Sequence, residues 1–294
     1  MKTVKGLHEK MGTFENANTS FHQAARCKRY TNEVLAFSMV KEEELLRATE
    51  EIQNLTYRQG EYKIFKVFEP KERLIMALPF YDRVVQHMIC NAIQPVFENG
   101  FYYHSYACRS GKGMHAASDT LYQWMYETEV KQGLRMYAFK GDISKYFASI
   151  PHDKLKDENR HYIGDKKALM LMDDIIDHNG ILPDGVGIPV GNLTSQLFAN
   201  VYGNKLDKFC KHVLHIPYFV RYMDDFIILS DDLEQLKEWV KRIEEFLENE
   251  MLLHINPKST ILYAGNGIDF CGYIHYADHK KVRKSSIRKL KQDV

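Results

Sequence analysis

The chain has 294 residues, of which 45% are hydrophobic and 27% are charged. These are ordinary proportions for a globular protein, and they exclude the disordered and fibrous classes. The formal net charge of +1 excludes a chain that is basic throughout. Residues 1–10 lack a signal pattern, and no apolar run approaches the ~20 residues of a membrane span. We therefore expect a cytoplasmic protein without membrane association.

Hydrophobic spacing predicts an α+β chain with a small sheet that helices cover on one side. Residues 41–52 have helical spacing, and residues 62–78 are typical of two short strands that turn at Glu-Pro-Lys-Glu, 69–72. Asp231, three residues before Glu234, resembles the first residue of a capping box. The other predicted elements are, in chain order, a helix over 81–97, a buried strand over 135–143, helices over 166–178 and 192–212, two strands over 218–229 and an amphipathic helix over 231–251.

Three pairs of adjacent aspartates occur in the chain, and the residues around each pair predict a different environment for it. The pair at 173–174 falls on the polar side of a predicted helix. The pair at 231–232 falls at a helix start, where acids favour the positive end of the helix dipole. Asp224 and Asp225 instead interrupt two apolar, strand-forming runs. Because two carboxylates there would repel each other and lose hydration, we predict a tight hairpin that presents both to divalent metal.

Asp142 is the third candidate acid. It follows the apolar run at 136–139 and precedes Ile143, so it falls on or at the end of a strand. Two strands that deliver three carboxylates to one point would form an oxygen site suited to Mg²⁺. Two ions about 4 Å apart could then hold the attacking and leaving oxygens of a phosphoryl displacement.

These residues also resemble a known family. Tyr-Met-Asp-Asp at 222–225 resembles the catalytic signature of reverse transcriptases, and Asp-Ile-Ser-Lys-Tyr-Phe at 142–147 resembles their first metal motif. The run Gly-Ile-Pro-Val-Gly-Asn-Leu-Thr-Ser-Gln at 187–196 resembles the motif that frames the nucleotide and template. Asn-Pro-Lys at 256–258 resembles the following lysine motif, and Phe-Cys-Gly-Tyr at 270–273 resembles the primer-grip hairpin. The five motifs occur in the family's order and cover nearly the whole chain.

The resemblance implies a right-hand polymerase fold of the α+β class, with fingers, a palm and a thumb that is largely missing. It implies a small antiparallel palm sheet backed by helices. The implied parts are an N-terminal helical extension over 1–55, fingers over 56–135 with part of 150–190 interleaved, a palm over 136–278 and the start of a basic thumb over 279–294.

The resemblance also implies residue roles. Asp142, Asp224 and Asp225, with the backbone of Ile143, would hold two Mg²⁺ ions, for which Mn²⁺ could substitute. Phe147 would be the steric gate that selects deoxynucleotides; a core phenylalanine is the alternative, and Tyr146 competes for the role. The other implied nucleotide-binding residues are Arg73, Lys71, Val190, Gly191, Gln196 and Lys258. Those implied for template or primer binding are Arg109, Tyr222, Met223 and Gly272.

The nucleotide motif departs from its commonest form, Gln-Gly-x-x-x-Ser-Pro, at both ends, where Val190 and Gln196 stand. This version resembles the reverse transcriptases of diversity-generating retroelements, as do residues 82–87 and 104–113. The resemblance implies error-prone cDNA synthesis on a template-repeat RNA, from a DNA or RNA primer and dNTPs. It also implies a basic oligomeric accessory protein as a partner.

Alternatives to this interpretation stay open. The nearest is another bacterial reverse transcriptase, of the retron, group II intron or phage-defence type. An RNA-dependent RNA polymerase and a catalytically inactive RNA-binding scaffold are more distant. The histidine pairs at 212–215 and 275–279 lack a third ligand, so we interpret them as structural or exposed.

Overall fold

The computed structural model describes residues 3–68 and 72–292, without the side chains of 289, 290 and 292. The chain divides into two compact units, each built from two segments. Unit 1 comprises residues 1–100 and 147–202, and unit 2 comprises residues 101–146 and 203–294. Residues 101–135, which the resemblance assigns to the fingers, therefore belong to unit 2. The division into fingers, palm and thumb stays a prediction.

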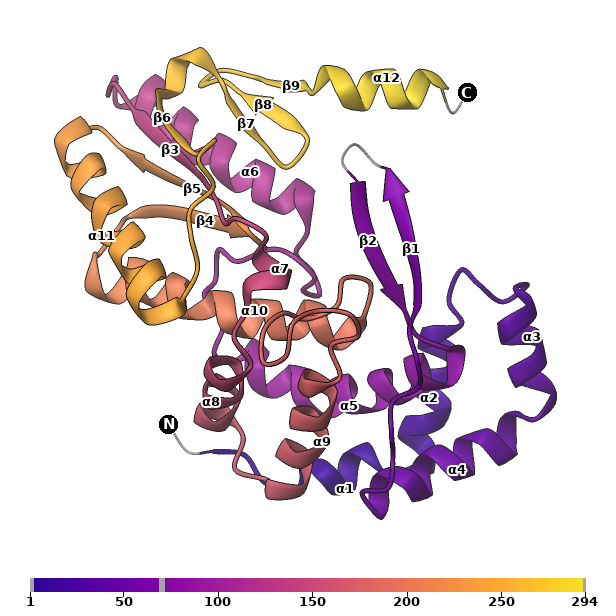
Figure 1. Ribbon diagram of the computed structural model, residues 1–294. Helices are drawn as coiled ribbons and strands as arrows, with labels where there is room; N and C mark the ends of the chain where they lie inside the picture. Colours follow the sequence, from indigo (N-terminus) through magenta and orange to yellow (C-terminus); the bar gives the residue numbers. More distant parts are fainter. Residues whose placement is uncertain (1–2, 69–71, 293–294) are drawn as a thin grey trace. The chain divides into compact units, whose positions relative to one another are not determined.

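Unit 1 is mainly helical and carries one β-hairpin (Figure 1). The hairpin pairs β1 (Lys63–Phe68) with β2 (Glu72–Ala77), which confirms the two predicted strands. The turn between them, with Lys71, lies outside the described residues. The helices are α1 (Leu7–Met11), α2 (Phe14–Ala24), α3 (Asn32–Met39), α4 (Lys41–Gln53), α5 (Phe80–Glu98), α8 (His152–Tyr162) and α9 (Lys166–Asp177). The short α7 (Tyr146–Ser149) and the long α10 (Leu193–Lys208) span the boundary between the units.

Unit 2 contains two antiparallel sheets. The larger has the strand order β4-β5-β3-β6, so the strand that ends in Asp142 is an inner strand. Its strands are β3 (Tyr137–Asp142), β4 (Tyr218–Tyr222), β5 (Asp225–Ser230) and β6 (Thr260–Tyr263). The smaller sheet comprises β7 (Ile268–Phe270), β8 (Tyr273–His275) and β9 (Lys280–Val282). The helical segments are α6 (Met114–Met125), η1 (Tyr126–Lys131), η2 (Phe209–Val213), α11 (Leu233–Met251), η3 (Ala264–Asn266) and α12 (Lys284–Gln292).

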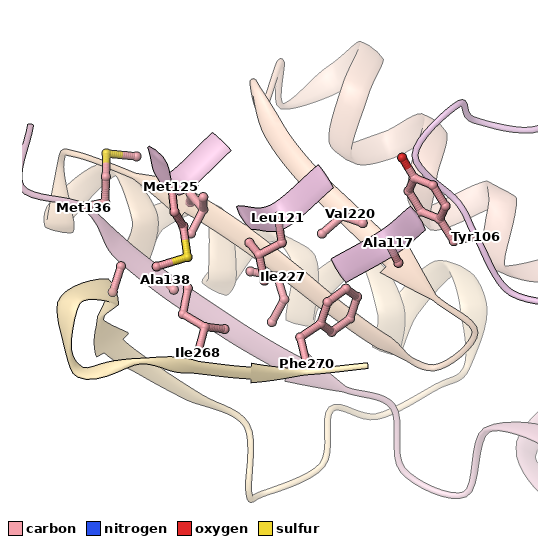
Figure 2. Packing of buried hydrophobic residues seen from close by; sticks show 12 residues of the cluster. Tyr106, Ala117, Leu121, Met125, Met136, Ala138, Val220, Ile227, Ile268 and Phe270 are labelled. Carbon is pink, nitrogen blue, oxygen red and sulfur yellow. The ribbon is translucent and has the colours of Figure 1, made fainter. Parts of the chain in front are cut away.

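Strand alternation divides the larger sheet of unit 2 into two apolar faces. One face packs against α6 and β7 through a fully buried cluster that includes Ala138, Leu121 and Phe270, shown in Figure 2. On the other face, the Phe226 ring contacts the rings of Phe139 and Phe219, and α11 packs against β3 and β5. Helices thus cover both faces, whereas the sequence pattern predicted one. The continuous apolar runs of β4 and β5 are typical of strands buried on both sides.

The α11 helix begins at Leu233, and its N-cap lies one residue later than the predicted Asp231. Asp232 is its N-cap, and the carboxylate accepts hydrogen bonds from the amides of Glu234 at 2.8 Å and Gln235 at 3.0 Å. Asp231 is exposed and lies outside the helix. Either aspartate satisfies the composition of a cap, so only the backbone path decides between them. Among the described residues, no helix combines the length and hydropathy needed to cross a membrane.

Candidate active site

The turn that carries Asp224 connects β4 to β5. Tyr222 pairs with Asp225, which leaves a two-residue loop of Met223 and Asp224. Met223 adopts φ 60°, the left-handed conformation that two-residue hairpin loops need. The predicted tight hairpin is therefore confirmed. The conformation is uncommon for a residue with a side chain, and Met223 is only 8% exposed.

Asp142 lies directly opposite Asp225 in the register of β3 and β5. Side chains of directly opposed residues in antiparallel strands have Cβ atoms about 4.5–5.5 Å apart. Beyond the strand end, the Ile143 amide donates a hydrogen bond to the Asp224 carbonyl at 3.3 Å. Two strands thus bring Asp142, Asp224, Asp225 and Ile143 to one corner of the sheet, which we call the acid corner.

Gly141 permits the close pairing of these two strands. A Cβ atom at Gly141 would overlap the ring of Phe226, its partner on β5. A larger residue would force the ring or the strand to move. The glycine before Asp142 therefore holds the register that sets Asp142 against Asp225.

The carboxylates of Asp142 and Asp224 lie close enough to Asp225 to affect its ionisation. Burial, followed by the charges of Asp224 and Asp142, raises the pKa of Asp225 to about 6. Lys140, two residues before Asp142 on the same face of β3, opposes this shift. A cation placed among the acids would relieve both their mutual repulsion and the loss of hydration.

A turn after α11 holds Asp142 in place. The Asn256 side-chain amide donates to Asp142 Oδ2 at 2.6 Å, and the Asn256 backbone amide donates to the Asp142 carbonyl at 2.8 Å. The Asp142 amide in turn donates to Ser259 Oγ at 3.0 Å. Lys258, the residue predicted from this motif, is exposed, and its amide donates to Asn256 Oδ1. Sequence reasoning missed Asn256 and Ser259, although the Asn-Pro step of the motif did indicate a turn.

A second feature that sequence reasoning missed lies beneath the Met223–Asp224 turn. Arg221 is 0% exposed and forms a two-point ion pair with Asp207, from Nε at 2.6 Å and from Nη2 at 2.7 Å. Its Nη1 donates to the Met223 carbonyl at 2.8 Å, and its Nη2 also donates to Ser105 Oγ at 3.0 Å. Burial alone would lower the pKa of Arg221, but the Asp207 carboxylate outweighs burial and raises it. Asp224 acts on the guanidinium in the same direction.

The hairpin between β7 and β8 borders the acids. Its two loop residues, Cys271 and Gly272, have φ of 49° and 83°. Burial and the charge of Asp225 raise the pKa of the Cys271 thiol to about 12. Tyr222 and Cys271 both pack against the buried cluster of Figure 2. The structure therefore places Gly272, Tyr222 and Met223, which were predicted to bind primer or template, around the acids.

Arg109, also predicted to bind the template, lies in the loop before α6. Its Nη1 donates to the carbonyls of Tyr102 and Ser105, both at 2.7 Å, and its guanidinium lies 5.1 Å from the centre of the Phe101 ring. These bonds hold the loop in shape. A contact with template stays a prediction.

Unit 1 holds most of the residues predicted to bind the nucleotide. Arg73 is exposed on β2, and the Val190 carbonyl accepts a hydrogen bond from the Met76 amide at 3.1 Å. Gly191, at φ 116°, and Gln196 line a cavity of about 170 Å³. Phe147 is half-buried, and its carbonyl accepts from the Ile188 amide at 2.8 Å.

Tyr146 lies in unit 2 and is 2% exposed. A Cβ atom at Gly203 would lie 2.9 Å from its hydroxyl, so this side chain belongs to the interior of that unit. Burial removes Tyr146 as a competitor for the gate. The assignment of Phe147 stays a prediction.

The acid corner fits hard divalent cations bound through oxygen. Within the described part of the chain, no three His, Cys, Asp or Glu side chains already form a closed ligand set. Mg²⁺ is usually held by one or two carboxylates plus substrate phosphates and water, so an open set of three acids is the type of site it uses. His275, in contrast, is structural as predicted, because its ring nitrogens bond Ser118 Oγ at 2.8 Å and the Ile268 carbonyl at 3.0 Å.

Residues 66–275, which include both strands of the acid corner, match the family of reverse transcriptases, the RNA-dependent DNA polymerases. The chain belongs to this family. The matched segment runs from β1 through β8 and contains all three acids.

Curated relatives of this reverse transcriptase are distant and longer. It is 25% identical over 251 residues to protein YkfC of Escherichia coli, which covers 70% of this chain and 62% of YkfC. It is 29% identical over 137 residues to an uncharacterized 91 kDa protein in a cob intron of Schizosaccharomyces pombe, which covers 45% of this chain and 16% of that protein. A putative COX1/OXI3 intron 2 protein of Saccharomyces cerevisiae is 22% identical over 254 residues, covering 65% and 29% of the two chains. The chain thus spans less than two thirds of each relative.

Solved structures confirm the polymerase fold. Apo telomerase from Candida tropicalis has a TM-score of 0.58 at 12% identity, over 76% of this chain and 48% of that chain. Telomerase from Candida albicans, in complex with a fragment of telomeric RNA, has a TM-score of 0.56 at 12% identity, over 78% and 48%. At this identity the likeness concerns the fold alone.

Proposed function

We propose that this chain catalyses RNA-directed DNA synthesis by two-metal nucleotidyl transfer at Asp142, Asp224 and Asp225. The observation that carries the proposal is the register that sets Asp142 opposite Asp225, next to a turn that adds Asp224. An RNA template, a DNA or RNA primer and dNTPs are the implied substrates. Membership of the reverse transcriptase family supports this reaction class.

The chain's own residues would bind and orient the reactants. Asp142, Asp224 and Asp225 would hold the cations, and Asn256 fixes the Asp142 carboxylate in one orientation. Two bound Mg²⁺ ions would lower the pKa of the primer 3′-hydroxyl and neutralise charge on the leaving pyrophosphate. Because this reaction needs little covalent chemistry from the protein, positioning and electrostatics carry most of the catalysis.

The first test is primer extension on an RNA template with Mg²⁺ and dNTPs. Metal ligation is worth several kcal/mol at the transition state, so Asp224→Ala should reduce the extension rate about 10³-fold or more. Asp174→Ala is the matched control, because Asp174 is exposed in another pair of adjacent aspartates on α9. Extension that survives Asp224→Ala, or that is lost equally in the control, would contradict the proposed site.

Within this class, we propose the error-prone type of the diversity-generating retroelements. The support is the nucleotide motif, in which Val190 stands where the common form has Gln and Gln196 stands where it has Pro. The Val190 backbone is fixed to β2, so a longer side chain would extend from a defined point. The valine side chain offers no hydrogen bonds to a base pair. A site that forms fewer hydrogen bonds with its substrate discriminates less between correct and incorrect nucleotides. A basic oligomeric accessory protein is the partner that this type implies.

Val190→Gln should lower misincorporation opposite template adenines, because the amide restores polar contacts. The measurement is sequencing of cDNA copied from one defined RNA by the two proteins. Errors opposite the other template bases are the internal control, since a general loss of activity would not change their ratio to adenine errors. An unchanged adenine error fraction would reject the role of Val190.

An intron-associated reverse transcriptase is the second candidate, because two of the distant relatives are named as intron proteins. The two types differ in the RNA that they copy. Accurate copying of adenines by the wild-type chain would favour the second candidate. A high adenine error rate would favour the first.

A further inference from the structure

We propose that Arg221 and Asp207 are a positioning pair that fixes the Met223–Asp224 turn, and thereby the spacing of the three metal-binding acids. The inference rests on the proposed metal site and adds two residues to it. Neither side chain needs to touch substrate. Their effect would pass through the Met223 carbonyl, which accepts a hydrogen bond from Arg221 Nη1.

The guanidinium forms hydrogen bonds in three directions. Nε and Nη2 bond the two oxygens of Asp207, Nη2 also bonds Ser105 Oγ, and Nη1 reaches the turn. Three differently directed contacts need a planar fork of donors, which arginine has and lysine lacks. A lysine here could neutralise Asp207 but could not reach the Met223 carbonyl as well.

Buried and hydrogen-bonded surroundings hold the Arg221 guanidinium in place. Asp207 is 0% exposed and lies on α10, and the Arg221 backbone is bonded to the segment before α6. The Arg221 amide donates to the His104 carbonyl, and the Tyr106 amide donates to the Arg221 carbonyl, both at 3.0 Å. Gly203, also on α10, leaves room for the fork, because a Cβ atom there would lie 2.6 Å from Arg221 Nη1.

Stability alone does not account for the pair. A buried ion pair loses hydration at both ends, and apolar side chains of similar volume often stabilise a fold as well or better. What apolar side chains cannot supply is a donor for the Met223 carbonyl, which sits in the left-handed part of the turn next to Asp224. Within the pair, it is the positively charged guanidinium of Arg221 that interacts with Asp224. Both features act on the position and charge of a metal ligand.

The decisive experiment separates fold stability from metal binding. In the double variant Arg221→Met/Asp207→Leu, apolar groups replace the ion pair, so the melting temperature should stay near that of the wild type. Mn²⁺ affinity, measured by the electron paramagnetic resonance signal of free Mn²⁺, should fall about 10-fold or more, as when groups that orient metal ligands are removed. Wild-type Mn²⁺ affinity in the folded double variant would overturn the proposal.

Two single variants test the same point where the double variant does not fold. Gly203→Ala places a methyl group against the guanidinium and displaces it, so it should weaken Mn²⁺ binding, with a loss of stability from overpacking that the helix preference of alanine offsets in part. Arg221→Lys keeps the charge and loses the fork, and should weaken Mn²⁺ binding and extension together. Ile243→Val, at a buried position of α11, is the control that lowers stability slightly without changing Mn²⁺ affinity.

Wild-type Mn²⁺ affinity in both Gly203→Ala and Arg221→Lys would also contradict the positioning role of Arg221 and Asp207. Failure of the wild type to bind Mn²⁺ would instead overturn the metal site itself.

Discussion

At Asp225, burial and the charges of neighbouring acids both oppose ionisation of the carboxyl group. It is half-buried, and both neighbouring acids act on it, so its pKa rises to about 6. An unfolded aspartate loses its proton near 3.8. Between these two values the folded chain binds more protons than the unfolded chain, so in the absence of metal this residue makes folding less favourable as pH rises through the window.

Added Mg²⁺ should therefore stabilise the chain in a pH-dependent manner. At about pH 5 a proton on Asp225 competes with the cation, whereas at about pH 7.5 the carboxylate is free to bind it. The rise in melting temperature on adding Mg²⁺ should be small at the lower pH and larger at the higher. Asp225→Asn should give a small rise at both. A Mg²⁺ effect that is equal at the two pH values in the wild type would contradict the assignment of Asp225.

At the scale of elements, the site depends on how β3 and β5 pair. Gly141 and Phe226 are partners in that register, and a Cβ atom at Gly141 would overlap the Phe226 ring. The strand ends in Asp142 only one residue further on. Local packing on one face of the sheet thus fixes the positions of acids on the other face.

Gly141→Ala should lower the free energy of unfolding by about 1–3 kcal/mol, the usual cost of overpacking. Urea unfolding would measure it. Phe226→Leu removes part of the ring, so the double variant should be more stable than the sum of the two single effects allows. Purely additive effects would show that the ring is not the group that excludes a side chain at position 141.

The sequence allowed the hairpin and its acids to be predicted, because a tight turn buries the two apolar runs as strands and leaves Asp224 and Asp225 at the strand end. It did not indicate Asn256 or Arg221. Asn256 bonds a residue 114 positions away, and Asp207 is 14 positions from Arg221 on a different element. Such contacts depend on strand register and helix docking, which local pattern does not determine. Asp232 was missed as the cap of α11 for a related reason, since two aspartates in a row differ only in backbone path.

At the scale of the whole molecule, both units are discontinuous in sequence. The inner strand β3 pairs with β5 and β6, which follow it in the chain by more than one element. A fragment that ends at residue 202 would contain all of unit 1 and would leave both edges of β3 unpaired. Unpaired strand edges promote association between chains.

The fragment 1–202 should therefore self-associate, and size-exclusion chromatography would detect it. Replacing residues 101–146 in that fragment with a flexible linker removes the unpaired strand and should give a monomer. A monomeric fragment 1–202 would show that β3 does not need its later partners to remain soluble.

The ion pair of Arg221 and Asp207 also limits which substitutions this chain can accept. Loss of either partner alone leaves one charge buried without compensation, which typically costs about 3–5 kcal/mol. Joint replacement avoids that penalty. Variants recovered from random mutagenesis with selection for activity should thus retain both residues, whereas a screen for solubility alone should also admit paired apolar replacements.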